Sequence, residues 1–168
     1  PLVLSYRAGL VSGVTVRAGV VSFALRGLDE RRVREAGQAF SETAIPTTIR
    51  AEAWARIQWH RDQGDTIVVV SGALDVYLGP WCAQHGFDLL CSRLQVRDGY
   101  LTGAYAGAQC VGEEKARQAE LHYPRANFRE VYAYGDTRED LAMLRNADHR
   151  FFRGRQWVDR DAAAEGRA

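Results

Sequence analysis

The sequence predicts an α/β fold in which helices cover a mainly parallel sheet. The clearest strand signal is the β-branched run from Thr66 to Val70. An unbroken run of this kind is typical of a strand buried on both faces, as in parallel sheets. A second apolar run, from Val131 to Tyr134, ends in Gly135 and precedes a helical pattern. Strands that alternate with helices in this way predict an α/β domain.

The first 25 residues are expected to form one or two buried or groove-lining helices. They are rich in Val, Leu, Ala and Gly, but Arg7 and Arg17 interrupt them. No run therefore reaches the roughly 18 uninterrupted apolar residues that a spanning helix needs. A helix lying on a membrane surface is the alternative for this segment.

Two further helices are expected before the Val-rich strand. The first follows Asp29, a plausible N-cap, and its predicted apolar stripe is Leu28, Val33, Ala36 and Phe40. Pro46 is expected to break the chain after it. The next helix should run from about Thr48 to Gln63, with Gly64 as its stop and an inward face of Ile49, Ala53 and Ile57.

From Ala73 onward, helices and strands alternate along the chain. The expected elements are helices over about 73–84 and 112–121, strands at 87–91, 131–134 and 150–152, and a hairpin over 94–102 that turns at Asp98-Gly99. After Gly154 the composition becomes polar and rich in Ala. The predicted organisation is a helical region over residues 1–64, an α/β core over 65–154 and a polar tail over 155–168.

Composition and charge exclude some classes of protein. With 22 Lys and Arg against 21 Asp and Glu, the net charge is +1, so no basic footprint for nucleic acid is present. The three cysteines, Cys82, Cys91 and Cys110, have no zinc or disulfide spacing. They are expected to be reduced thiols packed in a cytoplasmic protein.

Polar groups follow the Val-rich strand at its end. Ser71 and Gly72 come directly after Val70, and a helical pattern begins at Ala73. In parallel sheets, ligands bind at the carboxyl ends of the strands. A hydroxyl and two backbone amides beside a helix N-terminus are therefore expected to form an anion site.

Two carboxylates follow the second apolar strand. Asp136 and Asp140 are four residues apart at the start of a helical pattern, so they are expected to share one helical face and could bind a divalent cation. The simpler interpretation is that Asp136 is an N-cap and Asp140 complements the helix dipole. Lys115, in the first turn of the preceding predicted helix, opposes the dipole preference for anions. This local conflict suggests a functional lysine, although a surface lysine is equally compatible.

Together these groups suit a phosphoryl ligand. The Ser71 hydroxyl and the Gly72 amide would hold phosphoryl oxygens, Lys115 would neutralise charge, and Asp136 and Asp140 would hold Mg²⁺. No G-x-G-x-x-G motif or P-loop follows any predicted strand, which argues against another kind of nucleotide-binding domain.

The order and spacing of these motifs resemble those of the haloacid dehalogenase (HAD) superfamily. Residues 68–72 resemble its second motif, Lys115 its third, and residues 135–140 its fourth. The segments 60–64, 98–103 and 112–115 further resemble the phosphoserine-phosphatase-like subfamily IB. The resemblance covers about residues 28–153 and implies a Rossmann-like core with a small helical cap.

The resemblance also implies roles for the candidate residues. Ser71 and Gly72 would bind a phosphoryl oxygen, and Lys115 would pair with the phosphoryl group and the nucleophile. Asp136 would ligate Mg²⁺, and Asp140 would support the metal shell. At Thr137 and Glu139, phosphoserine phosphatases usually have Gly and Asn, which argues against phosphoserine itself as the substrate.

One family motif does not occur in these 168 residues. Family members begin with a strand ending in Asp-x-Asp-x-Thr, whose first Asp attacks phosphorus, and the sequence contains no such motif. The chain thus resembles a member that lacks its first strand and nucleophile.

These observations lead to a main hypothesis and an alternative. The parent protein is expected to be a Mg²⁺-dependent phosphomonoesterase that acts through an aspartyl-phosphate, whereas this chain by itself is expected to be inactive. The alternative is a non-catalytic module that binds a phosphate compound or a protein partner. The expected substrate is a small phosphomonoester, and a lipid phosphate or a membrane surface is a further option.

Overall fold

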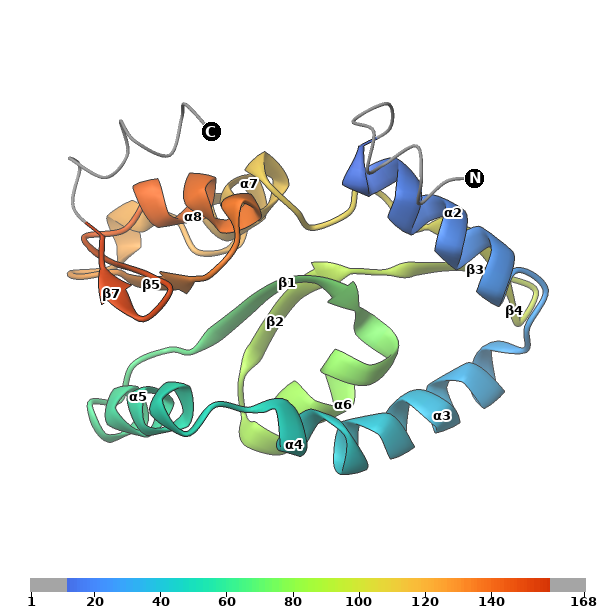
Figure 1. Ribbon diagram of the computed structural model, residues 1–168, viewed down its shortest axis with the longest axis horizontal. Helices are drawn as coiled ribbons and strands as arrows, with labels where there is room; N and C mark the ends of the chain where they lie inside the picture. Colours follow the sequence, from blue (N-terminus) through green and yellow to red (C-terminus); the bar gives the residue numbers. More distant parts are fainter. Residues whose placement is uncertain (1–11, 158–168) are drawn as a thin grey trace. The chain divides into compact units, whose positions relative to one another are not determined.

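The computed structural model describes residues 12–157, which fall into two compact units divided after Gln109. Each unit is described by itself. The first contains α2 (Gly13–Leu25), α3 (Glu30–Thr43), α4 (Ile45–Thr48), α5 (Ala51–Asp62), β1 (Val68–Leu74), α6 (Asp75–His85), β2 (Asp88–Ser92), β3 (Leu94–Arg97) and β4 (Tyr100–Tyr105) (Figure 1). The second contains α7 (Glu113–His122), the 3₁₀ turn η1 (Arg125–Asn127), β5 (Tyr132–Gly135), the 3₁₀ turn η2 (Arg138–Asp140), α8 (Leu141–Arg145), β6 (His149–Phe152) and β7 (Arg155–Gln156).

The predicted α/β fold with parallel strands is confirmed. In the first unit β1 and β2 pair in parallel, from Val68 opposite Asp88 to Ser71 opposite Cys91. In the second unit β5 and β6 also pair in parallel. The predicted hairpin is present as β3 and β4, and its turn residues Asp98 and Gly99 have φ angles of 52° and 81°. The predicted division into a helical cap and an α/β core stays a prediction.

The end of the Val-rich strand differs from the prediction. β1 continues to Leu74, and α6 begins at Asp75 instead of Ala73. The pairing with β2 shifts between Ser71 and Leu74, so the chain makes an irregular step before the helix. Such bulges re-aim side chains at the end of a strand. Ser71 and Gly72 therefore belong to the strand, and the prediction that they adjoin a helix N-terminus is wrong.

Helix α3 follows the predicted apolar stripe only in part: Val33 packs against the cluster of Val21, Val76, Leu94 and Leu101, but the most buried positions are small residues. Its buried positions are Gly37 and Ser41, whereas Ala36 and Phe40 are exposed. A Cβ atom at Gly37 would collide with the backbone carbonyl of Val76 in α6. The two helix backbones approach too closely for larger side chains at this crossing, and the period of apolar residues did not identify Gly37 and Ser41 as the buried positions.

The region around α5 confirms one expectation and corrects another. The helix is interrupted before Pro46, as predicted: α3 ends at Thr43, and Pro46 lies in the first turn of the separate short helix α4, where its missing N–H costs nothing. Ala53 is exposed, and the large ring of Trp54 instead packs against a buried cluster that includes Trp81 and Phe87. Aromatic burial therefore outweighs the small apolar Ala in orienting this helix.

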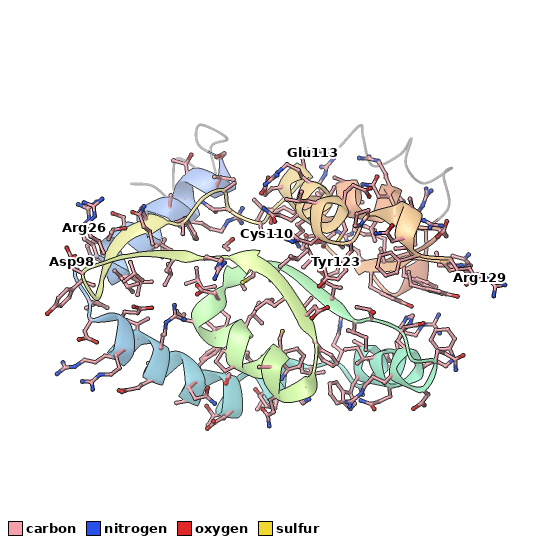
Figure 2. All side chains as sticks on the ribbon, turned by 180° about the vertical axis from the view of Figure 1, so that it is seen from behind. Arg26, Asp98, Cys110, Glu113, Tyr123 and Arg129 are labelled. Atoms are coloured by element: carbon pink, nitrogen blue, oxygen red, sulfur yellow. The ribbon has the colours of Figure 1, made fainter. Side chains whose placement is uncertain are left out.

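The second unit is organised around the parallel pair β5 and β6. Its buried cluster consists of Ala133, Leu141, Leu144, Ala147, Phe152 and Trp157. β7 extends the sheet by pairing antiparallel to β6 through a turn at Arg153 and Gly154, which have φ angles of 51° and 77°. Figure 2 marks Glu113 and Tyr123 at the two ends of α7. Residues 158–168 of the predicted tail lie outside the described residues, as do residues 1–11 of the predicted N-terminal helices.

Within residues 12–157, no helix combines the length and the apolar character that crossing a bilayer requires.

Candidate functional site

Asp140 is the centre of a hydrogen-bonded cluster in the second unit. Its side chain is buried, with 6% of the residue exposed. Its Oδ2 atom accepts hydrogen bonds from the backbone N–H groups of Asp136 (3.1 Å) and Thr137 (2.9 Å) and from the Thr137 hydroxyl (2.8 Å). Thr137 and Asp140 form a reciprocal capping box at the start of η2. The carboxylate thus fixes the turn that follows β5.

Lys115 donates to the other oxygen of the same carboxylate. Its Nζ atom lies 2.5 Å from Asp140 Oδ1, and the lysine is buried, so the surface interpretation is wrong. Burial would raise the pKa of Asp140, but the hydrogen bonds from Lys115 and Thr137 outweigh it and hold that pKa below its ordinary value. An ionised Asp140 compensates a cation in the first turn of α7, which explains the local conflict with the helix dipole.

Gly135 permits the close approach of Asp140 to the end of β5. A Cβ atom added at Gly135 would collide with Asp140 Cβ and would lie 3.0 Å from its Cγ and 3.1 Å from its Oδ2. Real Cβ atoms do not make contacts of this kind with a buried side chain. Glycine is therefore required here because a side chain would not fit. Its backbone conformation is not the reason, since the φ angle of Gly135 is not in the left-handed region.

Asp136 has a different environment from Asp140. It lies one residue before Thr137, the N-cap of η2, so it is not on the helix and is not the N-cap. The expectation that both carboxylates share one helical face is therefore wrong. Asp136 is exposed at the carboxyl end of β5.

The exposed Asp136 carboxylate is compatible with Mg²⁺. Such an ion is usually bound through one or two carboxylates, with waters and substrate phosphate completing its shell. No group of three potential metal ligands occurs among residues 12–157, so a preformed all-protein cage is absent there. The buried oxygens of Asp140 are already engaged by Lys115 and the turn, whereas Asp136 is exposed to solvent.

Ser71 and Gly72 lie in the first unit. The Ser71 hydroxyl accepts a hydrogen bond from the backbone N–H of Ala73 at 3.2 Å, across the irregular step at the end of β1. Both residues are partly exposed. The structure thus brings together Lys115, Asp136 and Asp140 in one unit, and describes Ser71 and Gly72 separately in the other.

Two residues of the second unit support the site and were not identified from the sequence. Thr137 closes the capping box, and a Thr three residues before an acidic residue is the signal that could have found it. Arg153 donates from its backbone N–H to the Gly135 carbonyl (2.8 Å) and from Nε to the Asp136 carbonyl (3.1 Å). Its positive φ belongs to the turn between β6 and β7, and no strand after Phe152 is predicted from the sequence.

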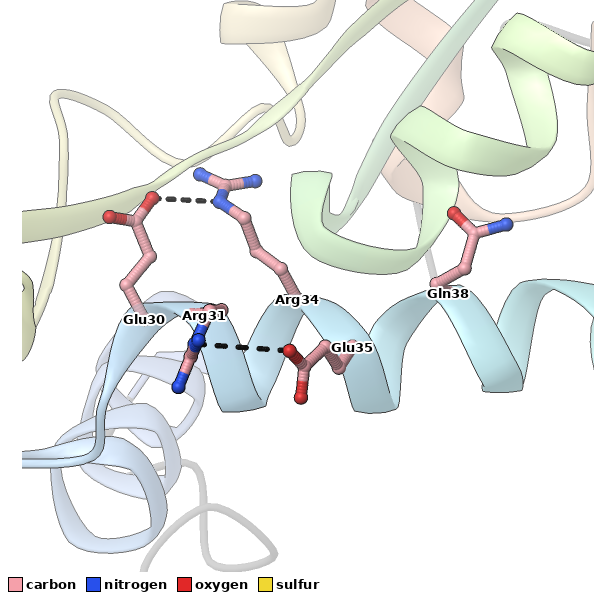
Figure 3. Close-up of a pocket in the computed structure, with 5 residues that line it drawn as sticks. All are labelled: Glu30, Arg31, Arg34, Glu35 and Gln38. Carbon is pink, nitrogen blue, oxygen red and sulfur yellow. Dashed lines mark hydrogen bonds and ion pairs between the residues drawn. The ribbon is translucent and has the colours of Figure 1, made fainter.

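Two surface depressions among residues 12–157 are not lined by Lys115, Asp136 or Asp140. One lies along α3 and is lined by Glu30, Arg31, Arg34, Glu35 and Gln38. Its arginines are paired along the helix, Arg34 with Glu30 at 2.7 Å and Arg31 with Glu35 at 3.9 Å, as Figure 3 shows. This is a solvated charged face and not a ligand site.

His60 contributes to the loop between α5 and β1. It is buried at the C-terminal end of α5, and its Nδ1 atom lies 2.6 Å from Asp65 Oδ2. The pair closes the loop between α5 and β1, because the backbone N–H of Asp65 also bonds to the His60 carbonyl at 3.0 Å.

Comparison with known proteins identifies a family. The model of the haloacid dehalogenase-like hydrolases matches residues 2–145 of the chain. Protein CicA of Caulobacter vibrioides is 33% identical over 146 residues, which are 83% of this chain and 65% of CicA. The chain therefore spans just under two thirds of the length of this relative.

Solved structures show the same fold. A protein of unknown function from Bordetella pertussis Tohama I superposes with a TM-score of 0.81 at 18% identity, over 99% of this chain and 76% of that one. A structure from Vibrio cholerae, named as a probable phosphoserine phosphatase, has a TM-score of 0.71 at 18% identity, over 90% of this chain and 45% of that one. At this identity the two structures are evidence for the fold alone.

Proposed function

The chain belongs to the haloacid dehalogenase-like hydrolases, and from that premise we propose that it carries the phosphate- and metal-binding part of a Mg²⁺-dependent phosphomonoester hydrolase. The observation that carries this proposal is the buried pair of Lys115 and Asp140 beneath the exposed Asp136. A cation held by a buried carboxylate, next to an exposed carboxylate, suits a phosphate dianion and a divalent cation together.

Each residue has a distinct part in the proposal. Asp136 binds the metal directly, whereas Asp140 acts as a positioning residue that orients Lys115 and the turn. Lys115 binds the phosphoryl group, and Ser71 with the Gly72 amide binds another of its oxygens. When bound, Mg²⁺ would neutralise negative charge on the phosphoryl oxygens.

The Thr137 side chain has a structural role at a position where the fourth motif differs from that of phosphoserine phosphatases. In phosphoserine phosphatases this position usually holds Gly, but here the Thr137 hydroxyl donates to Asp140 at 2.8 Å. A side chain committed to the turn changes the space next to Asp136. We therefore propose a small phosphomonoester other than phosphoserine as the substrate.

The proposed reaction requires a nucleophile from outside these 168 residues. Attack by an aspartate carboxylate on phosphorus would form an aspartyl-phosphate and release the alcohol, and water would then hydrolyse the acyl phosphate to aspartate and inorganic phosphate. Asp-x-Asp-x-Thr does not occur in the sequence. By itself, the chain is expected to bind inorganic phosphate with Mg²⁺ but not to turn over a phosphomonoester.

The test compares binding with turnover in the 168-residue chain. Calorimetric titration with inorganic phosphate should show binding that Mg²⁺ strengthens, and the Asp136→Asn variant should lose this Mg²⁺ effect. Glu113→Gln is a matched control, because it removes an exposed carboxylate of the same unit that has no part in the proposed site. The loss for Asp136→Asn should be about tenfold or more in affinity, as for a charge-assisted contact.

The same preparations are assayed with para-nitrophenyl phosphate. No Mg²⁺-dependent release of phosphate is expected from the chain alone, whereas a protein extended by a segment with Asp-x-Asp-x-Thr should turn over. Turnover by the chain alone that Asp136→Asn abolishes would place a nucleophile within these residues. Failure of both the chain and the extended protein to bind phosphate would instead favour a module that recognises a protein partner.

A further inference from the structure

Helix α2 and strand β4 lie side by side and run in opposite directions (Figure 1). In β4, a Cβ atom added at Gly103 would lie 3.1 Å from the Cα atom of Ser22, near the C-terminal end of α2. Beyond the end of β4, the Gln109 side chain donates to the Val14 carbonyl at 2.8 Å, near the N-terminal end of α2. Tyr105, the last residue of β4, therefore lies beside the middle of the helix.

Gln109 also holds an arginine on this side of α2. Gln109 is buried, with 8% of the residue exposed. Its Oε1 atom accepts a hydrogen bond from Arg17 Nε at 3.1 Å. Arg17 lies one helical turn before Val21, a residue of the buried cluster that also contains Leu101. The Arg17 guanidinium is therefore held next to this hydrophobic cluster, on the side of α2 that faces β4.

Two tyrosines lie close to this arginine. Tyr77 in the first turn of α6 and Tyr105 in β4 both pack against the cluster of Val21, and both are partly exposed. Burial raises the pKa of the Tyr105 phenol, the positive charge of Arg17 lowers it, and Tyr77 raises it further. Both groups are thus within electrostatic range of this hydroxyl, which stays protonated at neutral pH. Within residues 12–157, neither phenol hydroxyl has a hydrogen-bond partner.

The tyrosines lie beside the end of β1. Leu74, the last residue of β1, packs against the same buried cluster as both tyrosines. It closely follows Ser71 and Gly72 in the chain, and Tyr77 comes shortly after it in α6. A phosphoryl group bound by Ser71 would therefore have the two phenol hydroxyls as neighbours within the first unit.

From these observations we infer that Tyr77, Tyr105 and Arg17 bind a second anionic group of the phosphomonoester, carried by its alcohol part. The inference rests on the proposed function and names the substrate class for it. Protonated phenols donate hydrogen bonds to anionic oxygens, and a guanidinium supplies the opposite charge. A neutral apolar alcohol would instead remove water from the hydroxyls without offering them an acceptor. A carboxylate and a second phosphoryl group both have the required chemistry.

The test measures the affinity of the 168-residue chain for matched phosphate esters by calorimetric titration with Mg²⁺ present. Phosphoglycolate carries a carboxylate, ethyl phosphate has the same carbon chain without one, and ethylene glycol bisphosphate carries a second phosphoryl group instead. Because no turnover is expected from the chain alone, the esters stay intact during the titration. At least one of the two doubly anionic esters should bind about tenfold more tightly than ethyl phosphate, as for hydrogen bonds to a charged group. The stronger of the two identifies the second anion.

Tyr105→Phe is the decisive variant, because it removes the hydroxyl and keeps the ring in the hydrophobic cluster. It should weaken binding of the preferred doubly anionic ester by about tenfold, and far more than binding of ethyl phosphate. Tyr100→Phe is the matched control, because Tyr100 lies at the other end of the same strand and is 54% exposed. It should retain the full preference. Arg17→Lys keeps the positive charge and should preserve part of the preference that Arg17→Met loses.

The outcomes separate this inference from the proposed function. Equal affinity for all three esters, in a chain that binds inorganic phosphate, would overturn the inference and leave the proposed function standing. If neither inorganic phosphate nor any ester binds, the proposed function fails and the inference fails with it. A preference that persists in both Tyr105→Phe and Arg17→Met, or that Tyr100→Phe reduces as much as Tyr105→Phe does, would also overturn the inference.

Discussion

The carboxyl ends of β1 and β5 are both candidate phosphate-binding positions, yet they are built very differently. β1 ends in an irregular step in which the Ser71 hydroxyl accepts one backbone hydrogen bond of 3.2 Å. β5 ends at Gly135, where the buried Asp140 carboxylate accepts hydrogen bonds from Lys115, Asp136 and Thr137. The end of β1 is constrained by one side-chain hydrogen bond of Ser71, whereas the end of β5 is held by several hydrogen bonds to Asp140.

This difference suggests that the end of β5 mainly positions the proposed site residues, whereas Ser71 at the end of β1 mainly binds the ligand. A buried ion pair does not by itself add net stability, but the loss of one partner leaves an uncompensated charge. The end of β5 is therefore sensitive to any change that disturbs Asp140. The end of β1 can lose its hydroxyl with little structural consequence, so an effect of Ser71 on ligand binding would be direct.

The largest effect is expected from Lys115→Met. The change leaves the Asp140 carboxylate buried at 6% exposure without its cationic partner, and removal of one partner of a buried pair costs about 3–5 kcal/mol. Hydrogen exchange at the amides of residues 131–152 measures this loss within the second unit. Exchange in that segment should accelerate strongly at neutral pH.

Arg117→Met is the matched control on the same helix. Arg117 pairs with Glu114 at 2.6 Å on the surface of α7, where the arginine side chain is 59% exposed. Solvent screens such a pair, so little change in exchange is expected. Equal acceleration in the two variants would show that burial does not distinguish these ion pairs.

An intermediate effect is expected from Gly135→Ala. The added methyl group would meet the Asp140 side chain, and forcing a methyl group into a filled space costs about 1–3 kcal/mol. Gly13→Ala is the opposite control, because Gly13 lies in the first turn of α2, where an added Cβ would come no closer than 3.6 Å to the Arg17 side chain. This second substitution should stabilise by roughly 0.5–1 kcal/mol. Urea denaturation of both variants checks the signs, and stabilisation by Gly135→Ala would contradict the close approach described here.

The sequence predicted the structure correctly where a pattern of adjacent residues determines it. The β-branched run predicted β1, and Asp98-Gly99 predicted the hairpin turn, because each signal depends on a few adjacent residues. It failed where a contact between distant segments decides the outcome. The approach of α3 to α6 at Gly37 is invisible in the apolar period of α3 alone.

The candidate site shows the same limit. The types and spacing of Lys115, Asp136 and Asp140 predicted a site, but the spacing also predicted that both carboxylates share one helical face. Their separation into an exposed Asp136 and a buried Asp140 depends on a turn held by Thr137 and on the space left by Gly135. Arg153 was missed because its contact with the backbone of this turn arises from a later hairpin.

The smallest structural effect is expected from Ser71→Ala. The hydroxyl accepts a single hydrogen bond of 3.2 Å in a partly exposed position, so its loss should cost less than about 1 kcal/mol in urea denaturation. The same variant should weaken the affinity for inorganic phosphate by about tenfold, because a hydrogen bond to a charged group is stronger than one to a neutral group. Ser71→Thr retains a hydroxyl and should preserve more of this affinity. A destabilisation by Ser71→Ala as large as that of Lys115→Met would mean that both strand ends are held equally tightly, and the division between positioning at β5 and binding at β1 would then fail.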